Sequence, residues 1–267
     1  MPLDPARTVA ELKELEKLTG DENGSQRVAW TDTWETARAW LREQVASTGA
    51  EEEIDEAGNQ WFTLSGQSER ALLIGGHIDS VPNGGWLDGC LNVMAGVEVL
   101  RRIAEEGTPP LTVRLVNWAD EEGARFGRSL FGSSAAGGSM SDQSELRELR
   151  DADGTALPDA LAAHRVDLDR ALEARSQLGN AVAYLELHIE QGPVLESLGL
   201  PLGVVLGTFG VERHQITFRG QAAHAGSTPM DQRRDALAGA AKLELEIRAI
   251  AKRVGGGAVC TMGGVVT

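Results

Sequence analysis

Basic side chains, cysteines and long apolar runs are all scarce in this chain of 267 residues. Its 25 lysines and arginines stand against 40 aspartates and glutamates, which gives a formal net charge of −15 at pH 7. This excess of negative charge argues against nucleic acid as a partner, because phosphate contacts need clustered basic side chains, and against an anionic membrane surface. No stretch approaches the ~20 apolar residues of a membrane-spanning helix. We therefore expect neither nucleic-acid nor membrane partners.

The chain has two cysteines, Cys90 and Cys260, and neither belongs to a C-x-x-C pair. Residues 1–5 lack the basic start and apolar core of a secretory signal peptide. Two cysteines in a long chain without such a signal indicate reduced thiols, so the expected location is cytoplasmic. With 42% hydrophobic and 24% charged residues, the composition predicts an ordered globular chain of one large domain, or one and a half.

Apolar periodicity and glycines predict strands alternating with helices. Helices are expected at residues 33–46, 91–106 and 232–254, and strands at 71–74, 111–118 and 182–189. Residues 204–210 form a weaker extended segment, residues 214–219 alternate like a half-exposed strand, and a further strand is expected to start at 258–262. Residues 139–180 are polar and rich in alanine, which favours short surface helices. The strand, helix and strand within residues 71–118 make a βαβ unit, so the predicted class is α/β with a mostly parallel sheet.

Four polar clusters lie where predicted strands end, the edge at which open α/β sheets bind ligands. They contain His77 with Asp79, Asp88 within residues 85–89, the run of residues 120–123, and His188 within residues 186–193. Imidazole nitrogen and carboxylate oxygen are the donor atoms that zinc, manganese and cobalt accept. The shared position of the clusters favours a metal site.

The residue types within these clusters suggest roles around such a metal. The two oxygens of Asp88 suit a bridge between two cations, and Asp79 suits orientation of the His77 imidazole. The adjacent Glu121 and Glu122 offer one ligand and one general base for a water molecule. Each cluster taken alone also suits a structural histidine or a solvated acidic surface, and the spacing matches no short zinc signature such as H-E-x-x-H. Both interpretations stay open from the residues alone.

Four motifs carry a resemblance to a known family. Residues 77–89, 121–127, 186–193 and 224–230 with 233–235 resemble, in family order, the motifs of the amidase/hydantoinase/carbamoylase branch of the zinc peptidase-like amidohydrolases. This branch contains N-carbamoyl-L-amino-acid hydrolase, allantoate amidohydrolase and β-ureidopropionase. The resemblance covers about residues 30–267, and the four motifs together are highly specific.

The resemblance implies a pair of divalent ions, zinc, manganese or cobalt. His77, Asp88 and His188 match the ligands of the first ion, with Asp88 bridging to the second. Glu122 matches a ligand of the second ion. Relatives continue beyond the position of Thr267 and there supply a further histidine ligand and an arginine for the substrate carboxylate. Only the first set of ligands is therefore expected to be complete, and the chain is expected to be truncated at its C-terminal end.

The same resemblance assigns the remaining site residues. Glu121 matches the general base and Asp79 the residue that orients the histidine ligand. His224 matches a histidine that reaches into the partner subunit's site and stabilises the oxyanion, although a loop residue capping the next helix is the alternative from sequence alone. Gln191 matches a residue lining the substrate pocket. Asn92 departs from relatives that often have glycine there.

The expected fold is zinc peptidase-like, a mixed, mostly parallel sheet flanked by helices, with an incomplete α+β small domain. Residues 1–210 are expected to form the catalytic metal-binding domain and residues 211–267 part of a lid and dimerisation domain of a homodimer. The expected activity is metal-dependent hydrolysis of a linear C–N bond in a small ureido or amide substrate, first of all the carbamoyl group of an N-carbamoyl-L-amino acid. The alternatives are an allantoate or β-ureidopropionate hydrolase and, in a different class, an inactive metal-binding fragment.

Overall fold

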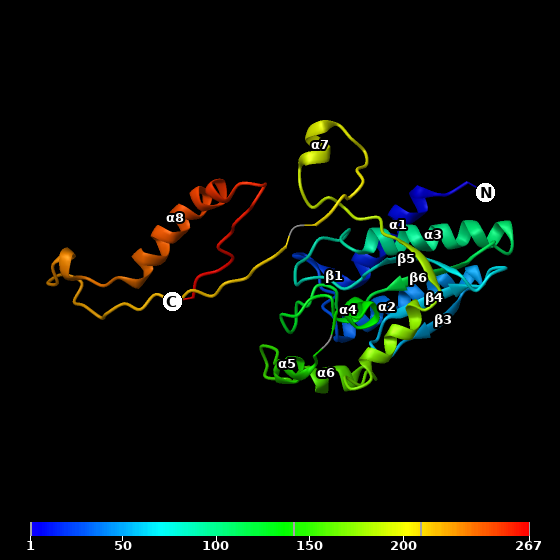
Figure 1. Ribbon diagram of the computed structural model, residues 1–267, viewed down its shortest axis with the longest axis horizontal. Coiled ribbons are helices and arrows are strands. Elements are labelled where there is room, and N and C mark those ends of the chain that lie inside the picture. Colours follow the sequence, from blue (N-terminus) through cyan, green and yellow to red (C-terminus); the bar gives the residue numbers. More distant parts are fainter. Residues whose placement is uncertain (1, 141, 209, 267) are drawn as a thin grey trace. The chain divides into compact units, whose positions relative to one another are not determined.

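The computed structural model describes residues 2–140, 142–208 and 210–266 and divides the chain into two compact units. The first unit is Met1–Pro201 and the second is Leu202–Thr267 (Figure 1). The expected division into a catalytic domain and a lid domain stays a prediction. Among the described residues, no helix is both long and apolar enough to cross a lipid bilayer.

A five-stranded mixed sheet forms the centre of the first unit. Its strands lie in the order β3 (Glu51–Ile54), β4 (Gln60–Leu64), β6 (Thr112–Asn117), β5 (Ala71–Gly76) and β7 (Ala181–Leu185). β5 is parallel to both β6 and β7, whereas β4 is antiparallel to both β3 and β6. The predicted α/β class with a mixed sheet between helices is confirmed, although only two of these four pairings are parallel. The hairpin of β3 and β4 was not predicted.

The two faces of the sheet carry alternate side chains, as the period of a strand requires. Leu73 and Val116 face one layer, whereas Ile74 and Leu115 face the other. The layer over Ile74 contains α1 (Pro5–Thr19), α2 (Asp32–Val45) and α3 (Cys90–Glu106). The layer over Leu73 contains α4 (Phe131–Gly137), α5 (Ser144–Glu148), α6 (Leu157–Ala163) and η2 (Ala171–Leu178). The sheet is thus covered on both sides.

The predicted helices are present, with local corrections. α2 and α3 match the predicted ranges closely. α2 begins one residue before the predicted start and is capped by Thr31, whose hydroxyl accepts from the amide of Trp34. The short helices within residues 139–180 pack into the core through buried residues such as Leu161 and Ala171, so they are not purely surface helices. α1 was not predicted, although Asp4 caps it and proline opens it.

Loops and turns join the remaining elements of the first unit. β1 (Gly20–Asp21) and β2 (Gly24–Ser25) form a two-stranded hairpin after α1, and η1 (Ala46–Thr48) extends α2. β7 ends at Leu185, four residues before the predicted end. α7 (Val194–Leu198) follows it.

The second unit contains a single long helix among its described residues. α8 (Ala236–Val254) is capped by Asp235, whose carboxylate accepts from the amide of Ala238, and ends at Gly255 with a φ of 73°. α8 therefore begins four residues later than predicted, and η3 (Met230–Gln232) precedes it. The strands predicted at 204–210, 214–219 and 258–262 are not formed in the described residues 202–208 and 210–266. A strand needs a hydrogen-bonded neighbour, and no pairing occurs there.

Candidate metal centre

The loop that connects β5 to α3 contains two of the predicted metal ligands. His77 follows the last residue of β5, and Asp88 lies just before Gly89, the N-cap of α3. Gly89 has a φ of 62°, and a Cβ there would lie 2.5 Å from Nε2 of His77. Only glycine tolerates both the left-handed backbone and the close approach. The local chain therefore brings Asp88 back toward the end of β5.

The third predicted ligand comes from the neighbouring strand. β7 runs parallel to β5, so His188, three residues after β7, reaches the same edge of the sheet. One ligand atom from each of His77, Asp88 and His188 lies within 4.8 Å of the other two. Nε2 of His188 is 3.5 Å from Oδ1 of Asp88. That oxygen is buried and has no hydrogen-bond partner in the described structure. A buried carboxylate oxygen without a hydrogen-bond partner, on a residue grouped with two imidazoles, fits a divalent cation.

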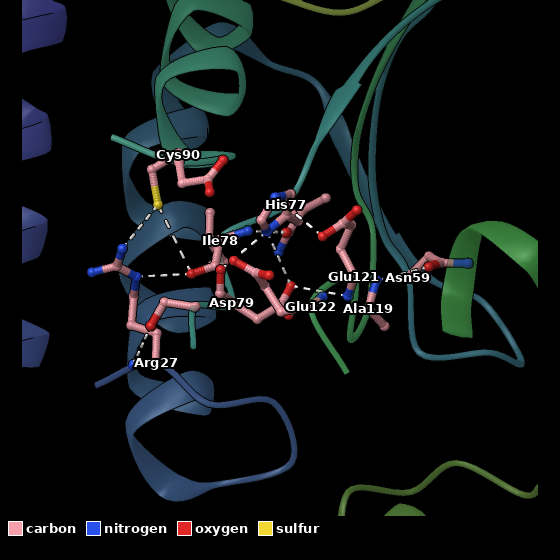
Figure 2. A network of polar contacts seen from close by, with 12 residues as sticks. Arg27, Asn59, His77, Ile78, Asp79, Cys90, Ala119, Glu121 and Glu122 are labelled. Carbon is pink, nitrogen blue, oxygen red and sulfur yellow. Dashed lines mark hydrogen bonds and ion pairs between the residues drawn. The ribbon is translucent and has the colours of Figure 1, made fainter. Parts of the chain in front are cut away.

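Asp79 links this ligand group to the loop after β6. Its carboxylate is 1% exposed and accepts from the backbone amides of Glu121 and Glu122 at 3.3 and 3.1 Å (Figure 2). Oδ1 of Asp79 also lies 3.4 Å from Nδ1 of His77, and the same nitrogen is 3.0 Å from the backbone oxygen of Asp79. On the other side of the ring, Oε2 of Glu121 is 3.6 Å from Nε2 of His77. Asp79 therefore contacts the imidazole and both glutamates of the pair.

Negative charge dominates this cluster. Burial acts to lower the pKa of His77, but hydrogen bonding to Asp79 and the charges of Asp79, Glu121 and Glu122 outweigh it and raise the pKa to about 10. Burial also raises the pKa values of Glu121 and Glu122, and the neighbouring carboxylates add to this effect while His77 opposes it. A proton on His77 relieves this repulsion in the metal-free chain, and a divalent cation would relieve it further.

Asp120 is a buried carboxyl that belongs to the third polar cluster but received no role from the sequence. It has a φ of 52° and starts the turn that carries the glutamate pair. Its Oδ2 accepts from the indole N–H of Trp30 at 2.8 Å, while Oδ1 has no partner in the described structure. Burial, together with the charge of Asp79, raises the pKa of Asp120 to about 7. No sequence pattern marks this contact, because Trp30 lies 90 residues away along the chain.

Two further side chains hold the segment around His188. The side-chain amide of Gln191 donates to Oδ2 of Asp88, so the residue predicted to line the pocket contacts a predicted ligand. Oδ1 of Asn92 accepts from the amide of Leu187 at 2.7 Å. The residue that departs from the family pattern therefore ties α3 to the backbone just before His188.

His224 belongs to the second unit, whereas the residues described above belong to the first. Its Nδ1 accepts from the backbone amides of Gly226 and Ser227, both at 3.1 Å, and the residue is exposed. In this unit the imidazole stabilises its own turn. It does not cap the next helix, contrary to the alternative interpretation from sequence, because Asp235 caps α8. Its expected role in a partner subunit stays a prediction.

Cys90 is buried beneath the loop, where its thiol contacts Arg27 and the backbone oxygen of Ile78. Burial raises the pKa of its thiol to about 11, against the opposing charge of Arg27. The raised pKa favours the neutral thiol in the metal-free chain. The other cysteine, Cys260, is exposed in the second unit.

Comparisons with known proteins agree with the motifs. The chain is 40% identical over 235 residues to an N-carbamoyl-L-amino acid amidohydrolase of Geobacillus stearothermophilus, a match that covers 87% of this chain and 57% of that protein. It is 35% identical to an allantoate amidohydrolase of Escherichia coli (strain K12), covering 91% of this chain and 59% of the other. The chain thus spans less than two thirds of the length of these relatives.

Solved structures give the same result. A hydantoinase/carbamoylase family amidase from Burkholderia ambifaria superposes with a TM-score of 0.69 at 31% identity, covering 95% of this chain and 62% of that one. These matches confirm the resemblance and the fold class drawn from the sequence motifs. The model of peptidase family M20/M25/M40 matches residues 73–263, which is most of the chain and includes all four motifs. The chain therefore belongs to the peptidase family M20/M25/M40.

Proposed function

We propose that this chain supplies the metal-binding part of an amidohydrolase that cleaves a linear C–N bond. The observation that carries the proposal is the group of His77, Asp88 and His188, whose ligand atoms lie within 4.8 Å of one another around an unpartnered carboxylate oxygen. The carbamoyl group of an N-carbamoyl-L-amino acid is the first candidate substrate, supported by the 40% identity to an amidohydrolase named for it. Hydrolysis would release the amino acid, carbon dioxide and ammonia.

These three residues would hold a first divalent ion, zinc, manganese or cobalt. Asp88 has a second oxygen to share, and Glu122 stands beside Asp79 to serve as a ligand of a second ion. When bound, such ions polarise the substrate carbonyl and increase the acidity of water. Asp79 would fix the orientation of the His77 ring through the contact at Nδ1, leaving Nε2 free to bind.

Glu121 is the proposed general base. Its Oε2 lies 3.6 Å from Nε2 of His77, next to the proposed ion. Burial and neighbouring carboxylates raise the pKa of Glu121, which brings it closer to the range in which a base accepts and returns a proton efficiently. Glu121 would take a proton from the attacking water and pass it to the leaving nitrogen.

The remaining assignments rest on the motifs. Gln191, which contacts Asp88, would line the substrate pocket. His224 would stabilise the oxyanion in the partner subunit of a homodimer. We also propose a cytoplasmic location, as expected for reduced thiols at Cys90 and Cys260. Light scattering would test the dimer.

Ammonia release tests the proposal. The chain, reconstituted with zinc, manganese or cobalt, is assayed with N-carbamoyl-L-amino acids, and Glu121→Gln is compared with Glu106→Gln, an exposed glutamate at the far end of α3. We expect activity in the parent and in Glu106→Gln and at least a 100-fold loss in Glu121→Gln, within the range that general base catalysis provides. Full activity in Glu121→Gln would refute the assigned base.

Allantoate is the second candidate substrate, because a relative named allantoate amidohydrolase matches at 35% identity. Comparison of kcat/KM for allantoate, β-ureidopropionate and N-carbamoyl-L-amino acids separates these hydrolases. No turnover of any of them, together with one bound ion per chain, would instead support a metal-binding role without catalysis.

A further inference from the structure

Arg27 lies wholly buried beneath the loop that carries two of the proposed ligands, with its side chain 0% exposed. Figure 2 shows its guanidinium bonded to the backbone oxygen of Ile78 and to the sulfur of Cys90. The Nε–Ile78 O distance is 2.8 Å and the Nη2–Cys90 Sγ distance is 3.2 Å. Nη1 donates to the side chains of Thr19 at 3.1 Å and Glu16 at 3.2 Å. A single side chain therefore joins α1 to both ends of the β5–α3 connection.

The residues that Arg27 contacts are next to ligands in the chain. Ile78 lies between His77 and Asp79, and Cys90 is two residues after Asp88. The thiol of Cys90 in turn lies 3.8 Å from the oxygen of Ile78, so guanidinium, thiol and carbonyl form a closed triangle. The triangle fixes the separation of the two chain segments that carry His77 and Asp88.

The backbone of Arg27 contacts the same loop. Its amide donates to the hydroxyl of Ser80 at 3.0 Å, and its carbonyl accepts from the amide of Ser80, also at 3.0 Å. Ser80 follows Asp79 directly, so the loop is held on both sides of that carboxylate. Arg27 and Ser80 are both buried, which protects these bonds from competition by water.

The planar fork of arginine suits this position and an ammonium group does not. Nε and Nη2 donate to two acceptors on one edge of the guanidinium while Nη1 reaches α1. A lysine keeps the charge but presents its donors from one nitrogen, so it cannot serve all of these acceptors at once. Loss of these bonds frees the loop without removing a ligand.

We propose that Arg27 is a positioning residue, which sets the separation of His77 and Asp88 and thereby the affinity of the site for a divalent cation. The inference rests on the proposed metal centre and adds to it a residue outside the family motifs. Arg27 itself touches neither cation nor substrate in this proposal. It acts through Ile78 and Cys90, as outer residues commonly act on metal ligands.

The first test is a cobalt titration of the full chain after metal removal, followed by calorimetry and by the visible absorption of bound Co²⁺. Arg27→Lys is compared with Arg38→Lys. Arg38 is also buried and donates to the oxygen of Gly58 at 2.9 Å, with no bond to the loop. We expect the Co²⁺ affinity to fall about 10- to 100-fold in Arg27→Lys, with an altered spectrum, and to stay unchanged in Arg38→Lys.

The second test needs no metal and separates this inference from the proposed function. Hydrogen exchange of the metal-free chain is expected to speed up in residues 77–90 of Arg27→Lys, and to stay unchanged in β6. Cys90→Ser, which keeps an acceptor for Nη2, should retain more protection and more Co²⁺ affinity than Cys90→Ala. Unchanged loop exchange and unchanged affinity in Arg27→Lys would overturn the inference. Failure of the parent chain to bind Co²⁺ would instead refute the metal centre, and the exchange data would then decide the positioning role alone.

Discussion

Replacing Asp79 by asparagine would remove the negative charge next to the His77 ring, whose Nδ1 is 3.4 Å from Oδ1 of Asp79. The two oxygens of Asp79 accept separately from the amides of Glu121 and Glu122. An asparagine keeps one acceptor and turns an NH₂ group toward the other amide. A bond to a charged group contributes about 1.5–3 kcal/mol, and a buried donor left unpaired costs about 1–3 kcal/mol. We therefore expect the free energy of unfolding of the metal-free chain to fall by at least about 2.5 kcal/mol.

The same change should lower the pKa of His77 from its present value of about 10, because burial then favours the neutral ring with less opposition. The raised pKa stabilises the native chain below pH 6.5, and this contribution is lost as the pH rises through about 10. In Asp79→Asn that loss should move to lower pH. The assay is ¹⁵N NMR of the histidine rings during a pH titration, with the His77 signals identified by His77→Gln.

Asp55→Asn is the matched control. Asp55 is also a buried carboxylate that accepts backbone amides, from Ala57 and Asn59 at 3.0 Å each, but it has no contact with His77. It should lose stability by a similar amount and leave the pKa of His77 unchanged. If His77 in Asp79→Asn still titrates near 10, the assigned electrostatic cause is wrong.

Three further predictions concern stabilisation by a bound metal ion, packing around Gly132 and the pKa of Asp120. In the parent, an ion at 100 times its Kd should stabilise the fold by about 2.7 kcal/mol and raise Tm in scanning fluorimetry, and His188→Ala should abolish this rise. Gly132→Ala should cost about 1–3 kcal/mol in urea unfolding, because a Cβ there would lie 1.9 Å from Oδ1 of Asn59. The raised pKa of Asp120 gives stability at low pH that is lost as the pH rises through about 7. Trp30→Phe removes a hydrogen bond to the charged form, so this loss should shift to higher pH in urea unfolding from pH 5 to 9.

Each of these has its own control and its own contrary result. Gly137→Ala, where an added Cβ meets nothing within 4 Å, should leave stability nearly unchanged, and an equal effect at both glycines would contradict the packing argument. His164→Ala removes a histidine that contacts Glu35 and should keep the response of Tm to metal. An unshifted pH dependence in Trp30→Phe would show that the indole does not set the pKa of Asp120.

The strand, helix and strand from β5 to β6 could be predicted from the sequence, because glycine and proline bound their apolar runs. Strand ends in a parallel pair meet at one edge, so the proximity of His77 and His188 also follows from sequence position. The strand expected at 214–219 is not formed, because its formation depends on more than its own sequence. Alternating side chains predict a strand, but a strand forms only when a second strand pairs with it. None of the described residues of the second unit forms such a neighbouring strand.

The residues to which the sequence assigned no role act through long-range contacts. Arg27 is one arginine in a segment without periodicity, and its partners Ile78 and Cys90 lie 51 and 63 residues away. The sequence assigned chemical roles only to the two glutamates that follow Asp120, and the hydrogen bond from Trp30 to Asp120 spans 90 residues of the chain. α1, in contrast, had a local signal in Asp4 followed by proline.

β7 is an edge strand with exposed side chains. It lies at the end of the sheet order, all five of its residues are exposed, and its register with β5 is irregular at Ala71 and Leu72. Segments of this kind open locally at a lower free energy than the core. Because His188 follows β7, each opening carries one proposed ligand away from His77 and Asp88. Cation binding and strand closure then form one coupled equilibrium, in which the apparent affinity is the intrinsic affinity multiplied by the fraction of molecules with β7 closed.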